Sequence, residues 1–295
     1  MRWRKQRRSQ NVDDRRGSGG MGGGGFPLPG GGKGGGVLLL VIVVGAILLG
    51  ADPQTLIGIL GDGSSGGLSP GYETQTTGTQ GVPENDEQAQ FASAVLGSTE
   101  DTWSAIFKAA NQQYPAPTLV LYSGLTRSAC GMGSAAAGPF YCPADQKLYI
   151  DLAFFRQLSG MGAPGDFARA YVIGHEVGHH VQNVVGTAEK VRKMQARAGE
   201  SESNALSVKM ELQADCYAGV WANHAHKTQN LLEEGDVDEG LAAAAAVGDD
   251  RLLKQAGRAV RPESFTHGTS QQRREWLLRG LKSGKLSDCD TFASL

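Results

Sequence analysis

The sequence predicts an α+β protein, mostly helical with a small sheet, in which a membrane helix and a disordered linker precede the folded domain. From residue 84 to the end, apolar residues recur at helical spacing in several long stretches, whereas β-rich runs are few and short. Residues 37–51 form an uncharged apolar run, and residues 52–83 are rich in Gly, Ser, Thr and Gln. These observations predict a membrane helix at 37–51, a flexible linker at 52–83 and a domain at 84–295.

The first 36 residues combine a basic cluster with a glycine-rich stretch. The basic residues are Arg2, Arg4, Lys5, Arg7, Arg8, Arg15 and Arg16, opposed only by Asp13 and Asp14. Because this composition cannot bury a core, we predict that residues 1–36 are disordered. The net charge of the chain is only −2, so we expect no nucleic-acid partner, although a nucleic-acid-binding arm is the alternative explanation of the cluster.

The apolar run at 37–51 is the predicted membrane anchor. It is shorter than the roughly 20 residues of a usual spanning helix, but uncharged residues extend it. A cleaved signal peptide is the main alternative, although the leader is long and no A-x-A site follows. A buried core segment is the other, although its flanks offer nothing to pack against it. Since Lys and Arg favour the cytoplasmic side, we expect a single-pass protein of the cell membrane with a cytoplasmic N-terminus and an extracytoplasmic domain.

The domain contains stretches typical of helices and two runs typical of strands. The Pro115 and Pro117 pair ends the first helical pattern. The predicted helices cover residues 88–113, 166–185, 203–226, 237–260 and 271–281, and the predicted strands cover residues 118–122 and 147–152.

Four cysteines lie in the region that we place outside the cytoplasm. An even number in an oxidising compartment favours disulfides. Cys130 and Cys142 flank a Gly- and Ala-rich stretch that can loop back, so we predict that they pair and that Cys216 pairs with Cys289. No C-x2-C pair occurs, which argues against a zinc site made of cysteines.

The segment from His175 to His179 reads H-E-V-G-H and is the strongest chemical signal in the chain. Positions i and i+4 share one face of a helix, so both imidazoles can reach one cation. Glu176 lies beside them and is suited to take a proton from zinc-bound water. The alternative is a pair of core histidines that bind no metal.

Two carboxylates one helical turn apart follow on a second predicted helix. Catalytic zinc takes three protein ligands, and Glu211 completes a set with His175 and His179. Asp215 is suited to accept the free ring N–H of a ligand histidine, which would fix its tautomer. An exposed acid on a helix surface is the alternative for Asp215, but the residues after it have buried character.

These motifs resemble those of the gluzincin metallopeptidases, which pair HExxH with a glutamate on a following helix. The sequence is still more similar to a bacterial family called putative neutral zinc metallopeptidases, single-pass membrane proteins with an extracytoplasmic domain. The resemblance covers nearly the whole domain and implies a zincin-like fold, a Zn²⁺ cofactor and a peptide or protein substrate. The segments that carry it are SACGMGSAAAGPFYCPADQKLYID (128–151), GHEVGHHVQ (174–182), ELQADCYAGVW (211–221) and FTHGTSQQRREW (265–276).

The leading functional hypothesis is hydrolysis of peptide bonds, with Glu176 as general base. We expect a substrate strand to pair with residues 147–151, which precede the metal-binding helix. An amidase that acts on cell-wall peptides would use the same chemistry. A membrane-anchored scaffold with a structural zinc is the alternative of a different class, and Glu176 argues against it because a structural site needs no general base.

His267 and Arg273 lie in a segment that resembles the His-Pro-x4-Arg stretch of membrane-bound prenyl and heat-shock metalloproteases, with Gly268 in place of the proline. We hypothesise that His267 donates to the oxyanion and that Arg273 holds its loop. The alternative is that His267 packs or caps a helix while Arg273 pairs with an acid such as Glu275 or Asp215. For His180 and for Asp249 with Asp250, we favour structural roles.

Overall fold

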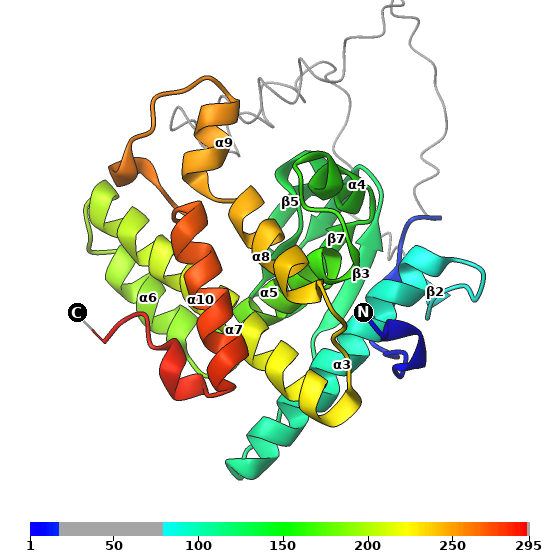
Figure 1. Ribbon diagram of the computed structural model, residues 1–295. Helices are drawn as coiled ribbons and strands as arrows, with labels where there is room; N and C mark the ends of the chain where they lie inside the picture. Colours follow the sequence, from blue (N-terminus) through cyan, green and yellow to red (C-terminus); the bar gives the residue numbers. More distant parts are fainter. Residues whose placement is uncertain (18–78, 294–295) are drawn as a thin grey trace, which may run out of the picture. The chain divides into compact units, whose positions relative to one another are not determined.

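The computed structural model describes residues 1–17 and 79–293, which form an α+β fold, mostly helical with one small mixed sheet (Figure 1). The predicted α+β class, mostly helical with a small sheet, is confirmed. The sheet has the order β2-β1-β3-β7-β6, in which β1, β3 and β7 are parallel and the two outer strands are antiparallel to their neighbours. Its strands are β1 (Val12–Asp14), β2 (Thr79–Gln80), β3 (Thr118–Tyr122), β6 (Phe140–Cys142) and β7 (Lys147–Asp151).

The N-terminal segment is part of this fold, so the prediction of disorder over residues 1–36 is wrong for the first seventeen. Residues Trp3–Lys5 form the short helix η1, and β1 pairs with β3 in the sheet. Trp3 and Val12 are buried in the main core. The composition argument fails here because a strand as short as Val12–Asp14 is held by its pairing with β3 and by the burial of one apolar side chain, Val12. The domain thus includes residues before 84 as well.

The helices form most of the remaining structure. They are α3 (Glu87–Ala109), α4 (Ala153–Gly160), α5 (Asp166–Val184), α6 (Thr187–Gln195), α7 (Glu200–Gln229), α8 (Asp236–Ala246), α9 (Asp249–Gln255) and α10 (Ser270–Ser283). The one continuous helix predicted over 237–260 is wrong, because the chain breaks it at Gly248. A Cβ there would lie 2.4 Å from the backbone nitrogen of Ser270, so only glycine permits this close approach.

Both predicted disulfides are present. Cys130 pairs with Cys142 and links the end of β6 to the turn of the hairpin β4–β5 (Leu125–Ser128 and Gly131–Ser134). Cys216 on α7 pairs with Cys289 in the short helix η4 (Leu286–Cys289). The second disulfide ties the last turn of the described chain to the helix that carries Glu211.

Helices α5 and α7 pack unusually closely, and two glycines of α5 permit this. A Cβ at Gly174 would lie 2.8 Å from the Trp221 ring, and a Cβ at Gly178 would lie 2.8 Å from the carbonyl oxygen of Ala214. Since His175 and His179 lie on α5 and Glu211 on α7, this packing decides how near the three side chains come to one another.

Two further predictions concern the membrane and the sheet edge. The apolar run at 37–51 lies outside the described residues, and among residues 1–17 and 79–293 no helix has the length and hydrophobicity needed to span a bilayer. Strand β7 lies between β3 and β6, so the prediction that residues 147–151 form an open edge is wrong. In the described sheet, the edge strand on that side is β6.

Candidate metal centre

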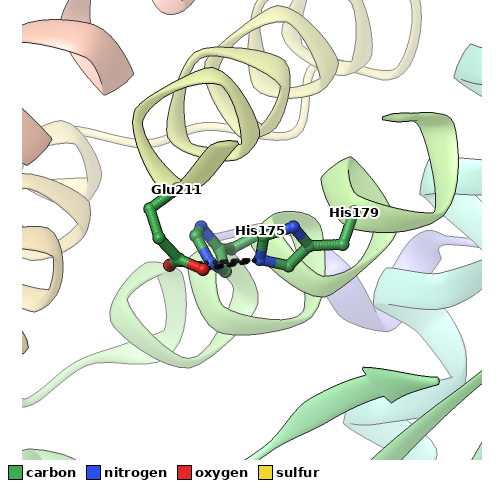
Figure 2. A group of neighbouring side chains, drawn as sticks. All are labelled: His175, His179 and Glu211. Carbon is green, nitrogen blue, oxygen red and sulfur yellow. Dashed lines mark hydrogen bonds and ion pairs between the residues drawn. The ribbon is translucent and has the colours of Figure 1, made fainter. Parts of the chain in front are cut away.

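Three side chains from α5 and α7 converge on one point (Figure 2). The Nε2 atoms of His175 and His179 are 3.1 Å apart. The carboxylate oxygens of Glu211 lie 3.2 Å from each of these nitrogens. The side chain of His175 is buried, and those of His179 and Glu211 are about one-fifth exposed (20% and 18%), so the cluster opens toward solvent on one side.

These distances fit a tetrahedral zinc site. Zinc binds imidazole nitrogen and carboxylate oxygen at about 2.0 to 2.1 Å, so two ligand atoms at the corners of a tetrahedron lie about 3.3 Å apart. The two Nε2 atoms are 3.1 Å apart, and each lies 3.2 Å from one oxygen of Glu211, Oε2 for His175 and Oε1 for His179, so all three distances are close to that spacing. The residues present therefore suit a zinc ion with a fourth position left for water or substrate.

Each histidine of the cluster has its other ring nitrogen engaged. Nδ1 of His175 lies 2.8 Å from Asp215 Oδ1, and Nδ1 of His179 lies 2.9 Å from Gln182 Oε1. Because both partners accept, Nδ1 carries a proton in each ring, which leaves Nε2 facing the cluster as the atom that would bind a metal. Gln182 itself is fixed, since its Nε2 donates to the carbonyl of Met210 at 2.7 Å. Gln182 is not among the predicted site residues, although its i+3 spacing from His179 on a helix is a signal for such a contact.

Asp215 is held in turn by two buried side chains. Arg273 donates to it through two nitrogens, Nε to Oδ2 at 2.8 Å and Nη2 to Oδ1 at 3.0 Å. The hydroxyl of Tyr171 donates to Oδ1 at 2.5 Å. Arg273 thus pairs with Asp215, which was the alternative that we gave for it, and the contact orients the partner of His175. Tyr171 was missed because a tyrosine four residues before a ligand on the same helix is indistinguishable from core.

The charges of the cluster favour a cation at its centre. Burial alone would lower the pKa of His175, but the carboxylates of Asp215 and Glu211 raise it to about 10. Burial opposes ionisation of Glu211 too, yet the two imidazoles hold the pKa of its carboxyl well below the usual range. In the metal-free protein a proton therefore occupies the position that a metal ion would take.

Glu176 lies beside the cluster with its carboxylate free. The residue is 7% exposed, and this burial raises its pKa. The positive charge of the two neighbouring histidines offsets this rise only in part. Among the described residues, none donates a hydrogen bond to the Glu176 side chain. A buried carboxylate with free oxygens and a raised pKa has the properties of a general base.

His267 is held in its loop by Asp249. Oδ2 of Asp249 accepts hydrogen bonds from the backbone nitrogens of Thr266, His267 and Gly268 at 2.7 to 3.0 Å. Its Oδ1 lies 3.1 Å from His267 Nδ1, which leaves Nε2 of the half-exposed ring without a protein partner among the described residues. The loop packs against α7 next to Glu211, since a Cβ at Gly268 would lie 3.4 Å from the side chain of Leu212. Asp249 thus has the predicted structural role, but it holds the His267 loop and does not cap α9, whose N-cap is Gly248.

His180 follows the second histidine of the cluster but points away from it. Its ring is fully buried, with Nε2 donating to the carbonyl of Pro115 at 2.6 Å and Nδ1 3.0 Å from the hydroxyl of Tyr141. These buried contacts agree with the predicted packing role of His180. The contact with the Tyr141 hydroxyl joins α5 to the edge strand β6.

Comparison with known proteins agrees with this geometry. A family model described as putative neutral zinc metallopeptidase matches residues 1–292. The chain belongs to this family. It is 49% identical over 294 residues to an uncharacterized protein of Escherichia coli strain K12, YpfJ, with 99% of both chains covered. It is also 37% identical over 262 residues to uncharacterized proteins of Mycobacterium bovis (Mb2605) and Mycobacterium tuberculosis (Rv2575), covering 84% of this chain and 85% of each relative. No solved structure matches the chain.

Proposed function

We propose that this protein is a zinc-dependent peptidase of gluzincin type with a zincin-like catalytic domain, in which His175, His179 and Glu211 hold the metal and Glu176 is the general base. The observation that carries the proposal is the convergence of His175, His179 and Glu211, with Nε2–Nε2 and Nε2–oxygen distances of 3.1 and 3.2 Å, next to the buried Glu176 carboxylate, which accepts no hydrogen bond from the described part of the chain. A structural zinc site has no use for such a base.

Zinc, when bound, acidifies a water molecule and polarises the carbonyl of the scissile bond. The chain's own residues supply the remaining steps. The Glu176 carboxylate takes a proton from the attacking water and then gives it to the leaving amine. Asp215 keeps the proton of His175 on Nδ1, and Arg273 and Tyr171 keep Asp215 in position, so the ligand geometry is fixed before substrate arrives.

His267 is suited to stabilise the negative charge that develops on the carbonyl oxygen. Asp249 holds its Nδ1, and Nε2 is left to donate toward the substrate. Burial lowers the pKa of His267, but the hydrogen bond with Asp249 and the charge of Glu211 outweigh burial and raise it, which favours the protonated, donating form of the ring. A donor aimed at such an oxyanion typically contributes about 3 to 4 kcal/mol to the lowering of the barrier.

A peptide substrate fits the free edge of β6. In the described sheet β6 pairs only with β7, and it lies against α5 through the hydrogen bonds that the Tyr141 hydroxyl makes with His180 and Asn183. An extended peptide that added a strand there would run alongside the helix that carries the metal ligands. This edge replaces residues 147–151 as the candidate.

An amidase acting on cell-wall peptides remains a variant of the same proposal, because its chemistry and residues are the same. The scaffold with a structural zinc is disfavoured by the free carboxylate of Glu176. Attachment to the cell membrane through residues 37–51 and an extracytoplasmic position of the domain also stay proposals. The two disulfides support the second, since disulfides persist in oxidising compartments.

The test is the Glu176→Gln variant, assayed for peptide release from cell-envelope proteins by mass spectrometry. It should keep its zinc and its melting temperature and lose turnover by about 10²- to 10⁴-fold, because only proton transfer is removed. Glu189→Gln, on an exposed face of α6, is the matched control and should be fully active. Normal turnover in Glu176→Gln, or no activity in the wild type with any substrate, would refute the proposal.

A further inference from the structure

The first sixteen residues, which we call the N-terminal strap (Met1–Arg16), are built into the domain at its sheet and its core. Strand β1 lies between β2 and β3, with Val12 opposite Leu119 and Asp14 opposite Leu121. Val12 is 2% exposed, and Trp3 is 4% exposed and packs edge-to-face on Phe91 at 5.4 Å. Without the strap, the buried strand β3 would become an open edge.

A buried carboxylate of the domain depends on the strap. The side chain of Glu100 on α3 is 7% exposed. It accepts hydrogen bonds from Arg7 Nη2 at 2.8 Å, Ser9 Oγ at 2.6 Å and Asn11 Nδ2 at 2.8 Å. Among the described residues, these three are its only donors, and all belong to the strap. Removal of the strap would leave a buried charge without partners, which proteins rarely tolerate.

The arginines of the strap are engaged in ion pairs within the folded domain. Our predicted orientation used them as free charges that stay in the cytoplasm. The structure shows instead that most of them pair with acids of the strap or of the domain. The pairs are Arg2 with Glu233, Arg4 with Glu87, Arg7 with Glu100 and Asp101, Arg15 with Asp13, and Arg16 with Asp14 and Asp86.

We infer that the strap and the domain lie on the same side of the membrane. The strap and the rest of the domain, from residue 78 on, form one compact unit, and β1 pairs with β2 through the register Asp14 to Thr79. A single membrane crossing by residues 37–51 would place these two paired strands on opposite sides. If residues 37–51 attach to the bilayer, the chain must therefore reach the membrane and return from it on the side where the domain lies. The short apolar run, below the roughly 20 residues of a spanning helix, is consistent with this.

This inference differs from the orientation that the basic cluster predicts, with a cytoplasmic N-terminus and an extracytoplasmic domain. It does not depend on the metal chemistry. It restricts any bilayer contact made through residues 37–51 to the side of the membrane on which the strap and the domain lie. The active site would then meet substrates on that side only.

Cysteine labelling of the full chain in intact cells tests the inference. The four native cysteines are paired and do not react, so single cysteines can be introduced at Gln10 in the strap and at Gln255 on α9, which are both exposed. A membrane-impermeant maleimide should modify Gln10→Cys and Gln255→Cys under the same condition, either both in intact cells or both only after the membrane is opened. Modification of the two positions from opposite sides would overturn the inference.

A third variant, Val12→Cys, tests whether the strap is inserted in the sheet of the membrane-bound protein. Its side chain is buried, so it should resist the maleimide under conditions in which Gln10→Cys reacts fully. Rapid labelling of Val12→Cys, in protein that retains both native disulfides, would show that β1 is outside the sheet and would also overturn the inference.

Discussion

Gly178→Ala tests how the packing of α5 on α7 controls the metal centre. The added Cβ would lie 2.8 Å from the Ala214 carbonyl oxygen and 3.0 Å from its Cα, where ordinary contact begins at 3.4 Å. The two helices must then separate by about half an ångström, because backbone atoms in a close-packed interior have nowhere else to move. Glu211 lies one turn before Ala214 on α7, so its carboxylate shifts with the helix.

The expected size of the effect follows from the tolerance of zinc coordination. Metal–ligand distances hold within about 0.2 Å, so a shift of this size weakens or breaks the bond to Glu211. We expect zinc affinity to fall by about 10- to 100-fold, the range for a disturbed ligand support, and the metal-free protein to lose about 1 to 3 kcal/mol of stability by overpacking.

Competition with a chromophoric chelator measures the affinity of Gly178→Ala, and urea unfolding of the metal-free protein measures its stability. Gly199→Ala is the control, since Gly199 precedes α7 and no atom would lie within 4 Å of its Cβ. The control should keep its zinc affinity and change stability by less than about 0.5 kcal/mol. Unchanged zinc affinity in Gly178→Ala would refute the claim that the packing of α5 on α7 sets the spacing of the three proposed ligands.

Three further predictions concern the groups around the site. Arg273→Lys loses the two-pronged contact with the buried carboxylate, so zinc affinity should fall by about 10- to 100-fold in a chelator competition, whereas Arg274→Lys on the exposed face should match the wild type. Asp249→Asn should lower the pKa of His267 in an NMR titration of the metal-free protein. The pKa of His267 is higher in the folded protein than its ordinary value of 6.5. Protonation of His267 therefore stabilises the fold fully below pH 6.5, and this stabilisation is lost as the pH rises through the folded-state pKa. Asp249→Asn should abolish this pH dependence of stability. Reduction of the Cys216 disulfide, which spans 73 positions, should cost about 4 kcal/mol in urea unfolding, and a loss under 1 kcal/mol would contradict that value.

Local patterns predicted most of the helices and the clustering of His175, His179 and Glu211. The geometry of the H-E-V-G-H motif can be predicted from the sequence, because the i and i+4 spacing alone places two imidazoles on one face of a helix. The prediction that Glu211 joins the two histidines needed a second helix with a carboxylate downstream of the motif. Both features can be recognised in the sequence. The break at Gly248 was not, because it depends on the approach of Ser270, which is distant in sequence.

The N-terminal strap shows where composition misleads. Its arginines and the glycines that follow are typical of a disordered, charged leader, yet the contacts that join the strap to the domain are long-range, such as Ser9 with Glu100 or Val12 with Leu119. Partners of this kind leave no periodic signal in a single sequence. The same holds for Asp249, whose role toward His267 appears only when the loop after α9 folds back onto it.

Zinc K-edge X-ray absorption of the purified protein tests the central claim most directly. We predict one zinc per chain, with two imidazole nitrogens and oxygen ligands at about 2.0 to 2.1 Å and no sulfur in the coordination shell. In Glu211→Ala the zinc should be largely lost. A zinc shell that contains sulfur, or full zinc occupancy with an unchanged spectrum in Glu211→Ala, would contradict the assignment of His175, His179 and Glu211 as the ligands.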